Sequence, residues 1–311
     1  MSTDLLASHP RYLAHARPAW DALPPGARGR ILAPGDLAGQ GLVLAASLVD
    51  AQDAARAGRR VALLAHGIGQ AYDGRPLGWV DGMIAPAVYL APGPYAATWA
   101  RALWPGCRVE VVGPPGLDAL FHGKRSNRGQ PRAESGPGCR PVVGLGFRFL
   151  GGATSVPEAT SALTHYLPGL RGLAARYELI GHGHPRAMGR LAGLYAAHGI
   201  EVVRDWAAVL ARADVWCADS SSTLYEAAAC GLPVVALDAP WYRREVHHGL
   251  RWWDSVPGER VDGPAALPDA IDRALAGVPD PGLSVGALAA AYGGHADGHA
   301  AERAAAILGA L

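Results

Sequence analysis

The segment ADVWCADSSSTLYEAAACGLPVVALDAP, residues 213–240, decides the fold of this chain. An apolar run, Val215–Cys217, stops at Asp219, and an alanine-rich stretch then leads to a second apolar run beginning at Pro233. Short apolar runs that are bounded by turn residues and joined by a helical stretch are typical of a βαβ unit with parallel strands. Four hydroxyl side chains in a row, Ser220–Thr223, stand where the first strand turns into the helix.

The same alternation of strand and helix extends over most of the chain. Apolar runs bounded by Gly, Pro or Ser predict further strands, and amphipathic stretches between them predict helices. The predicted strands are 41–47, 59–67, 85–93, 107–113, 178–182 and 201–203, and a further one begins at Pro141. The predicted helices are 48–58, 94–106, 157–177 and 186–199.

One segment interrupts this pattern. Residues 122–140, HGKRSNRGQPRAESGPGCR, show no period and are rich in Gly, Pro and charge, which is typical of a linker. We therefore expect two α/β domains of Rossmann-like type, 1–137 and 138–311, facing a cleft that is the default ligand site. The last helix, near 300–311, is expected to pack back onto the first domain.

Composition excludes several classes of protein. Half of the 311 residues are hydrophobic and 18% are charged, which is typical of a globular protein. The net charge of +1 gives no electrostatic attraction to nucleic acid or to an anionic membrane. No apolar run is long enough to predict a membrane span, and the N-terminus lacks the apolar centre of a signal peptide. Its four cysteines are scattered, so we expect free thiols and a cytoplasmic location.

The hydroxyl cluster has two interpretations. A helix N-terminus at the carboxyl end of a parallel strand suits a phosphate group, and serine hydroxyls add donors without a fixed charge. The alternative is helix capping, in which Glu226 closes a capping box on Thr223. Because one cap needs only one hydroxyl, four in a row favour phosphate binding by Ser220–Thr223, and Asp219 beside them is assigned to the same donor-binding segment.

Several motifs together resemble one family. The motif DSSSTLYEAAACGLPVVAL is similar to the donor-binding segment of GT-B glycosyltransferases, most closely the CDP-glycerol glycerophosphotransferase-like group. That group's His-Pro and His-Gly motifs resemble ELIGHGHP and AHGIGQAY, and its Pro-Gly-Pro segment resembles LAPGPYAATWARALWPGCRVEVVGPPGLDAL. The resemblance covers most of residues 41–240. Ser220 stands where the group usually has an aromatic residue, so the resemblance does not decide which nucleobase and which alcohol the donor carries.

The resemblance implies roles for the histidines. His184, together with His182, would lie near the donor diphosphate in the C-terminal, nucleotide-binding domain. His66 follows a buried strand in the N-terminal, acceptor-side domain, and its unperturbed pKa suits a general base at neutral pH. The residues that follow it are assigned to the acceptor side: Gly67 lets a substrate approach the backbone closely, and Gln70, Tyr72 and Asp73 either position the acceptor or orient the imidazole.

Each of the other candidate donor-binding residues has both a binding and a purely structural interpretation. Gly144 and Gly146 follow the predicted strand as a phosphate-approach loop or a plain turn, and Arg148 is either a diphosphate partner or a solvated arginine. Glu226 would bind ribose hydroxyls or only cap the helix. The two histidines of GHGHP share a strand face, but no carboxylate or cysteine accompanies them at ligand spacing, so no metal site is predicted.

These residues predict a metal-independent transferase that moves a glycosyl or glycerophosphoryl group from a nucleotide diphosphate donor to an acceptor hydroxyl. The donor, of UDP or CDP type, is a substrate, and no separate cofactor is expected. The acceptor stays open between a polymer, a glycan, a protein and modified DNA. The alternatives are an enzyme similar to the nucleotide-sugar 2-epimerases, which would need further acid/base carboxylates, and a non-catalytic nucleotide-binding homologue.

Overall fold

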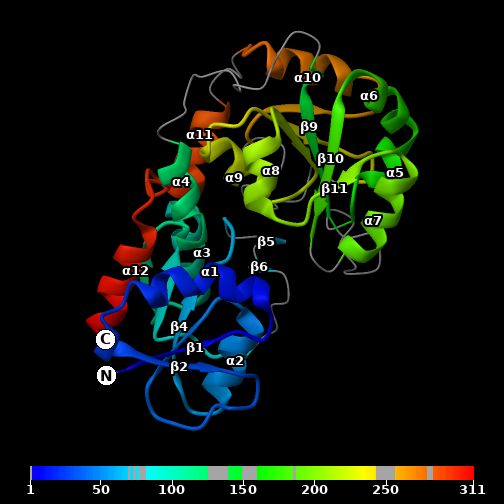
Figure 1. Ribbon diagram of the computed structural model, residues 1–311. Helices are drawn as coiled ribbons and strands as arrows, with labels where there is room; N and C mark the ends of the chain where they lie inside the picture. The colour runs from blue at the N-terminus through cyan, green and yellow to red at the C-terminus, as the bar shows by residue number, and fades with distance from the viewer. Residues whose placement is uncertain are drawn as a thin grey trace. The chain divides into compact units, whose positions relative to one another are not determined.

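The computed structural model describes residues 2–68, 71–72, 75–76, 82–124, 139–148, 160–184, 187–242, 256–278 and 283–311. It divides into two compact units, Met1–Gly123 with Ala289–Leu311, and Lys124–Leu288. Each unit holds a parallel sheet of six described strands (Figure 1). The prediction of an α/β fold with two Rossmann-like domains is confirmed. Most of the predicted linker, 125–138, lies outside the described residues.

Unit 1 is built on a sheet with the order β2-β1-β3-β4-β7-β8. Its strands are β1 (Thr3–Leu6), β2 (Arg28–Leu32), β3 (Leu42–Ala45), β4 (Arg60–Leu64), β7 (Val88–Ala91) and β8 (Arg108–Val111). Its helical segments are α1 (Pro10–Asp21), η1 (Pro25–Ala27), α2 (Leu48–Arg56), α3 (Pro94–Leu103), η2 (Pro115–Leu117), α4 (Asp118–Lys124) and α12 (Ala300–Gly309). A separate antiparallel pair joins β5 (Ala71–Tyr72) to β6 (Arg75–Pro76).

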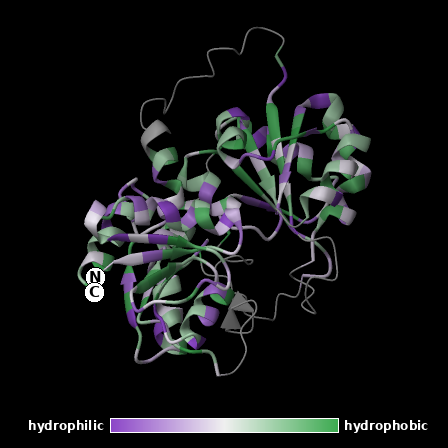
Figure 2. Cartoon of the chain, turned by 60° about the horizontal axis from the view of Figure 1, so that its bottom comes forward, coloured by the Kyte–Doolittle hydropathy of each residue, from purple (hydrophilic) through white to green (hydrophobic). Residues whose placement is uncertain are grey.

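Both faces of this sheet are buried, which explains the continuous apolar runs. Along β4, Ala62 and Leu64 point into one core cluster while Val61 and Leu63 point into the other. Strands covered on both faces are apolar without alternation, as expected in parallel sheets flanked by helices. Figure 2 shows hydrophobic residues along the central strands, whereas the surrounding helices carry both hydrophobic and hydrophilic residues.

The chain returns to unit 1 at its C-terminal end. Helix α11 (Leu283–Tyr292) contains the division between the units, and α12 then places Ala304, Ala305 and Leu308 in a core cluster with Leu5 of β1. The start of α12 is capped from a distant part of the chain, because the carboxylate of Asp118 accepts hydrogen bonds from the N–H groups of Ala300 (3.2 Å) and Ala301 (2.7 Å).

Unit 2 repeats the parallel architecture with the order β11-β10-β9-β12-β13-β14. The strands are β9 (Val142–Phe147), β10 (Glu178–Gly183), β11 (Glu201–Val202), β12 (Val215–Ala218), β13 (Val234–Leu237) and β14 (Glu259–Val261). The helical segments are α5 (Leu163–Tyr166), η4 (Leu167–Gly169), α6 (Leu170–Arg176), α7 (Met188–Ala197), α8 (Trp206–Arg212), α9 (Thr223–Ala229) and α10 (Leu267–Leu275).

The predicted single helix over 157–177 is wrong. Its described part consists of two short helices, α5 and α6, joined by the 3₁₀ turn Leu167–Gly169. The break has a local cause: Pro168 has no N–H to donate, and its ring disfavours a regular helical conformation of the preceding turn. Residues 157–159 of the prediction lie outside the described residues.

Replacing Asp118 tests whether the returning helix stabilises unit 1. Asp118→Ala removes a side-chain cap from α12 and should lower the free energy of unfolding by about 0.5–2 kcal/mol. Asp118→Asn keeps one acceptor oxygen and should lose less. Urea unfolding followed by circular dichroism measures both variants, and identical transitions for Asp118→Ala and the wild type would contradict the capping role.

Candidate functional site

The candidate site of unit 2 lies where the strand order reverses. The chain passes from β9 to β10 on one side of the sheet and later builds β12 to β14 on the other side, so the topological switch lies between β9 and β12. Ligands of open parallel sheets bind outside the carboxyl ends of the strands at such a switch. Arg148 follows β9 and Asp219 follows β12 at this edge.

The two glycines of β9 make room for a large side chain. Gly144 and Gly146 lie inside the strand, so the prediction that they form a loop or turn after it is wrong. A Cβ atom at Gly144 would be 2.6 Å from the Trp216 indole, and one at Gly146 would be 2.2 Å away. Trp216, on the neighbouring strand β12, is 1% exposed. The glycines therefore serve the packing of Trp216.

Trp216 starts a chain of hydrogen bonds that ends in the hydroxyl cluster. Its Nε1–H donates to Thr223 Oγ1 (3.2 Å), and the Thr223 hydroxyl donates to Ser221 Oγ (2.9 Å). Ser221 Oγ also accepts from the Thr223 N–H at 3.3 Å. A serine oxygen that accepts two hydrogen bonds keeps its own hydrogen for a third partner. The Ser221 side chain is half-buried, and its hydroxyl is set up as a donor.

The capping box considered for these residues does not form. Thr223 is the first residue of α9 and not its N-cap; the N-cap is Ser222, whose side chain makes no capping hydrogen bond. A capping box needs the hydroxyl at the N-cap and the acidic residue at N3, whereas Glu226 lies one position too far from Ser222. Glu226 is itself buried in the first turn of α9.

Asp219 and Arg148 are buried at the carboxyl ends of β12 and β9, where the topological switch lies. The Asp219 carboxylate accepts hydrogen bonds from Arg148 N (3.0 Å), Ala162 N (3.0 Å) and Ser161 Oγ (2.9 Å). Burial raises the pKa of Asp219, while these donors and the Arg148 charge act in the opposite direction. Arg148 is only 6% exposed and donates to Ser220 O, so its interpretation as a solvated arginine is wrong.

The two histidines of the GHGHP motif lie at the end of β10, beside β9. His182 Nδ1 is 2.9 Å from Val203 O, so this nitrogen carries the hydrogen and Nε2 is an acceptor in the neutral ring. Burial lowers the pKa of His182, and its ring packs on the indoles of Trp206 and Trp216. His184 follows the strand, and its carbonyl accepts from Met188 N at the start of α7.

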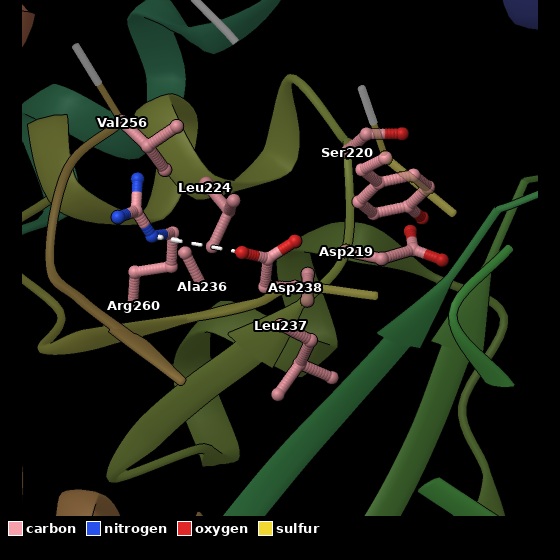
Figure 3. A pocket seen from close by; sticks show the side chains of 10 residues that line it. Asp219, Ser220, Leu224, Ala236, Leu237, Asp238, Val256 and Arg260 are labelled. Atoms are coloured by element: carbon pink, nitrogen blue, oxygen red, sulfur yellow. Dashed lines mark ion pairs between the residues drawn. The ribbon is translucent and has the colours of Figure 1, made fainter. Parts of the chain in front are cut away.

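A pocket opens beside the hydroxyl cluster, at the carboxyl ends of β12 and β13. It is lined by Ala218, Asp219, Ser220, Leu224, Ala236, Leu237, Asp238, Tyr242, Val256 and Arg260 (Figure 3). Asp238 and Arg260 form an ion pair at 3.7 Å on one side, and Asp219 and Ser220 lie on the other side. Its lining combines apolar and charged side chains, and its volume of about 20 Å³ has room for a water molecule. Sequence reasoning missed Asp238 and Tyr242, which follow β13, and Arg260, which lies on β14.

The candidate base lies in unit 1, after β4. His66 is exposed, and its Nδ1 is 2.5 Å from Ala46 O, so the hydrogen lies on Nδ1 and the lone pair on Nε2. Gly67 has φ of +87°, a left-handed conformation that favours glycine. Tyr72 belongs to β5, whereas Gln70 and Asp73 lie outside the described residues.

Two residues of α1 that sequence reasoning missed surround His66. The ring of Tyr12 meets the His66 ring edge-on at 5.1 Å between centroids, and the His15 ring is 5.9 Å away. Burial, with the nearby His66 and Arg11, lowers the pKa of His15 to about 4, so His15 is neutral at pH 7. The sequence offered one signal, a histidine and a tyrosine on one face of the first helix.

Comparison with solved structures identifies the fold. No protein-family model and no curated protein sequence matches the chain. The UDP-GlcNAc 2-epimerase of Methanocaldococcus jannaschii, in complex with UDP-GlcNAc and UDP, superposes with a TM-score of 0.65 at 14% identity, over 100% of both chains. The wall teichoic acid polymerase TagF gives 0.62 at 11% identity, over 99% of this chain and 88% of that one. The chain thus has a GT-B-type fold.

A third structure, MnaA of S. aureus with UDP, gives a TM-score of 0.58 at 12% identity over 97% of this chain and 94% of that one. At these identities the likeness concerns the fold. Within the described ranges, no three His, Cys, Asp or Glu side chains gather as a possible metal site. None of the helices in the described part of the chain is long and apolar enough to cross a membrane.

Because Trp216 packs directly against Gly146, a larger residue at position 146 should lower the stability of the protein. Gly146→Ala places a methyl group against the Trp216 indole and should cost about 1–3 kcal/mol of unfolding free energy, as overpacked cores do. Gly172→Ala is the matched control, because nothing lies within 4 Å of the added atom in α6. It should be neutral or stabilising by about 0.4–1 kcal/mol. Equal melting temperatures for the two variants would refute the packing role.

Proposed function

We propose that the chain is an enzyme acting on a nucleotide diphosphate-linked substrate, and that it transfers a glycosyl or glycerophosphoryl group to an acceptor hydroxyl. Unit 2 binds the donor through Ser221, Ser222, Arg148, His182 in β10 and His184 after it. Unit 1 supplies His66 as the general base. The resemblance to the CDP-glycerol glycerophosphotransferase group and the fold shared with TagF support this assignment.

The observation that carries the proposal is the hydrogen-bond chain from Trp216 to Ser221. Each hydroxyl in it accepts before it donates, so the chain has a fixed direction and ends at a half-buried O–H. Hydrogen bonds in such a series polarise one another. An anionic phosphate oxygen is the partner that gains most from a donor of this kind. Helix α9 has only seven residues, so the side chains, more than the helix dipole, hold the diphosphate.

The chemistry then divides between the two units. His66 Nε2 takes the proton of the acceptor hydroxyl while the acceptor oxygen attacks the transferred carbon or phosphorus. The bond from that atom to the nucleotide breaks, and the negative charge that develops on the leaving phosphate is stabilised by hydroxyl and guanidinium donors. The Ala46 carbonyl holds the Nδ1 hydrogen and thereby keeps the lone pair on Nε2.

A nucleotide-sugar 2-epimerase is the second candidate, favoured by the superposition on the M. jannaschii enzyme over the full length of both chains. A thermal-shift panel of UDP, CDP, GDP and their sugar or glycerol conjugates identifies the donor, because binding raises the melting temperature. Incubation of that donor without acceptor then separates the candidates. An epimerised sugar supports the epimerase, and an unchanged donor that turns over with an acceptor supports the transferase.

Replacing His66 tests the base. His66→Ala should lower turnover by roughly 10²–10⁴ and leave the Kd for the donor almost unchanged, because a general base acts in the transition state. His299→Ala, an exposed histidine of unit 1, is the control and should keep wild-type turnover. Wild-type turnover of His66→Ala with the true acceptor would remove His66 from the mechanism.

Replacing the serines tests the donor site. A hydrogen bond to a charged oxygen contributes about 1.5–3 kcal/mol, so the Ser221→Ala/Ser222→Ala double variant should bind the nucleoside diphosphate well over tenfold more weakly. The matching nucleoside, which lacks phosphates, should bind almost as before. Calorimetry with both ligands measures the difference. Equal, small losses for the two ligands would show that these serines only support the start of α9.

A further inference from the structure

Unit 1 has a topological switch of its own, between β1 and β3. The chain builds β2 on one side of β1, and β3, β4, β7 and β8 on the other side. Helix α1 begins shortly after β1, and Ala46 follows β3. His66, after β4, reaches this point through the contact of its Nδ1 with the Ala46 carbonyl oxygen. The start of α1 and the candidate base therefore lie at the same edge of the parallel sheet.

The buried face of α1 fixes the helix to this sheet. Residues on that face recur at the spacing of an amphipathic helix: Tyr12, His15, Ala16 and Ala19. Ala16 and Ala19 belong to a core cluster against which Tyr12 also packs. The end of the helix is tied by Trp20, whose Nε1–H donates to a carbonyl oxygen of β1 at 2.7 Å. The core of unit 1 therefore sets where the backbone of Tyr12 and His15 lies.

The side chains of Tyr12 and His15 are also held by neighbours other than His66. The Arg11 guanidinium lies over the Tyr12 ring, with its Cζ 4.4 Å from the ring centre, and its Nη2 donates to the Tyr12 hydroxyl (2.6 Å). The 3₁₀ turn η2 approaches His15 so closely that a Cβ atom at Gly116 would be 3.2 Å from His15 Nδ1. Both rings are thus restrained before they meet His66.

These two rings limit the rotation of the His66 imidazole. One hydrogen bond fixes the position of Nδ1 but leaves the plane of the ring undefined. Half a turn about the Cβ–Cγ bond would exchange Nδ1 with Cδ2, and the Ala46 oxygen would lose its donor. The Tyr12 ring lies 5.1 Å from the His66 ring at 68° between planes, and the His15 ring lies 5.9 Å away at 42°. Since the hydrogen bond of one nitrogen decides where the lone pair is, a restrained ring keeps it on Nε2.

The charge of His15 is compatible with this role. Burial, with His66 and Arg11 nearby, lowers the pKa of His15 to about 4, so its ring is neutral at pH 7. His66 becomes a cation when it takes a proton, and a positive charge on a ring 5.9 Å away would oppose that step. A neutral ring restrains His66 without opposing its protonation.

We propose that Tyr12 and His15 are positioning residues that act through His66, by holding its ring in the orientation that keeps the hydrogen on Nδ1 and the lone pair on Nε2. This assignment rests on the proposed function of His66 as the general base. Neither residue needs to touch the substrate. A base that is already oriented reaches the geometry of proton transfer with a smaller loss of entropy.

The tautomer of His66 is read from the ring ¹⁵N NMR signals of its neutral imidazole, assigned with His66→Gln, in the protein without substrate. In the wild type the hydrogen should reside on Nδ1. Tyr12→Ala and His15→Ala should each raise the share of the Nε2–H tautomer. Each should also lower kcat by about 10-fold to 10²-fold and leave the Kd for the donor unchanged, because a misplaced base affects the chemical step.

Tyr12→Phe and His15→Phe keep a ring at each position and should recover most of the kcat lost in the alanine variants. Arg17→Ala is the matched control, since Arg17 lies on the same helix with an exposed side chain paired to Asp21, and it should match the wild type in tautomer and kcat. Tyr12→Leu and His15→Leu replace an alanine variant that does not fold, because they restore apolar volume without a ring.

The proposal is overturned if the ringless variants of Tyr12 and His15 keep the wild-type tautomer of His66, or if they change the tautomer and keep the wild-type kcat. A wild-type His66 that already mixes its tautomers would overturn it as well. Lost turnover in His66→Ala beside an unchanged tautomer in the ringless variants refutes the positioning role and leaves the base in place. Wild-type turnover of His66→Ala removes the base instead, and the substrate-free NMR spectra distinguish the two failures.

Discussion

The position of the candidate donor site depends on the contact between the Trp216 indole and two glycines of the adjacent strand. Because Gly144 and Gly146 have no Cβ, the indole lies flat over β9, and its N–H is held at the carboxyl end of the sheet. That N–H orients Thr223, which in turn orients Ser221. The packing of Trp216 in the core thereby fixes the orientation of the half-buried Ser221 hydroxyl. Rigid elements that fix a polar group in this way reduce the reorganisation needed when a ligand binds.

The two units use the same topological device with different chemistry. In unit 2, the switch between β9 and β12 holds Arg148 and Asp219, which are hydrogen-bonded to each other through the Arg148 N–H, and the hydroxyl cluster follows Asp219 in the chain. In unit 1, the switch between β1 and β3 holds the rings of Tyr12, His15 and His66 together with the Arg11 guanidinium. The first site is built from buried charged groups and hydroxyls, whereas the second is built from aromatic and imidazole rings. This contrast is why the diphosphate is assigned to unit 2 and the general base to unit 1.

The strands that are continuous apolar runs could be predicted from the sequence, and so could the placement of Ser220–Thr223 between a strand and a helix. Strand β1 was missed because it opens with Thr3 and Asp4, and the buried Asp4 has its partners far along the chain, an ion pair with Arg59 (2.7 Å) and a hydrogen bond from the Arg30 N–H (2.8 Å). The misplacement of Gly144 and Gly146 has a similar origin, since the reason for both glycines is a side chain at position 216. Local patterns do not reveal such long-range partners.

The same limit applies to the site. Tyr12 and His15 occupy an ordinary amphipathic helix, and only the fold places them beside His66. The sequence did not decide whether Arg148 faces solvent or binds the diphosphate. Its burial depends on contacts with Asp219 and Ser220, which are again distant in sequence. The hydroxyl donors were recognisable because four adjacent residues carry them. Clusters formed by one segment can be found from the sequence, whereas clusters assembled from several segments require the structure.

The return of α12 to unit 1 also has a consequence for how the protein is made. Translation delivers the chain from its N-terminus, and domains generally fold as they emerge. Unit 1 cannot complete its core in that order, because Ala304, Ala305 and Leu308 are synthesised after the whole of unit 2. Until α12 has been synthesised and packed, the face of β1 and α1 that receives it stays exposed, and exposed apolar surface of this kind promotes aggregation.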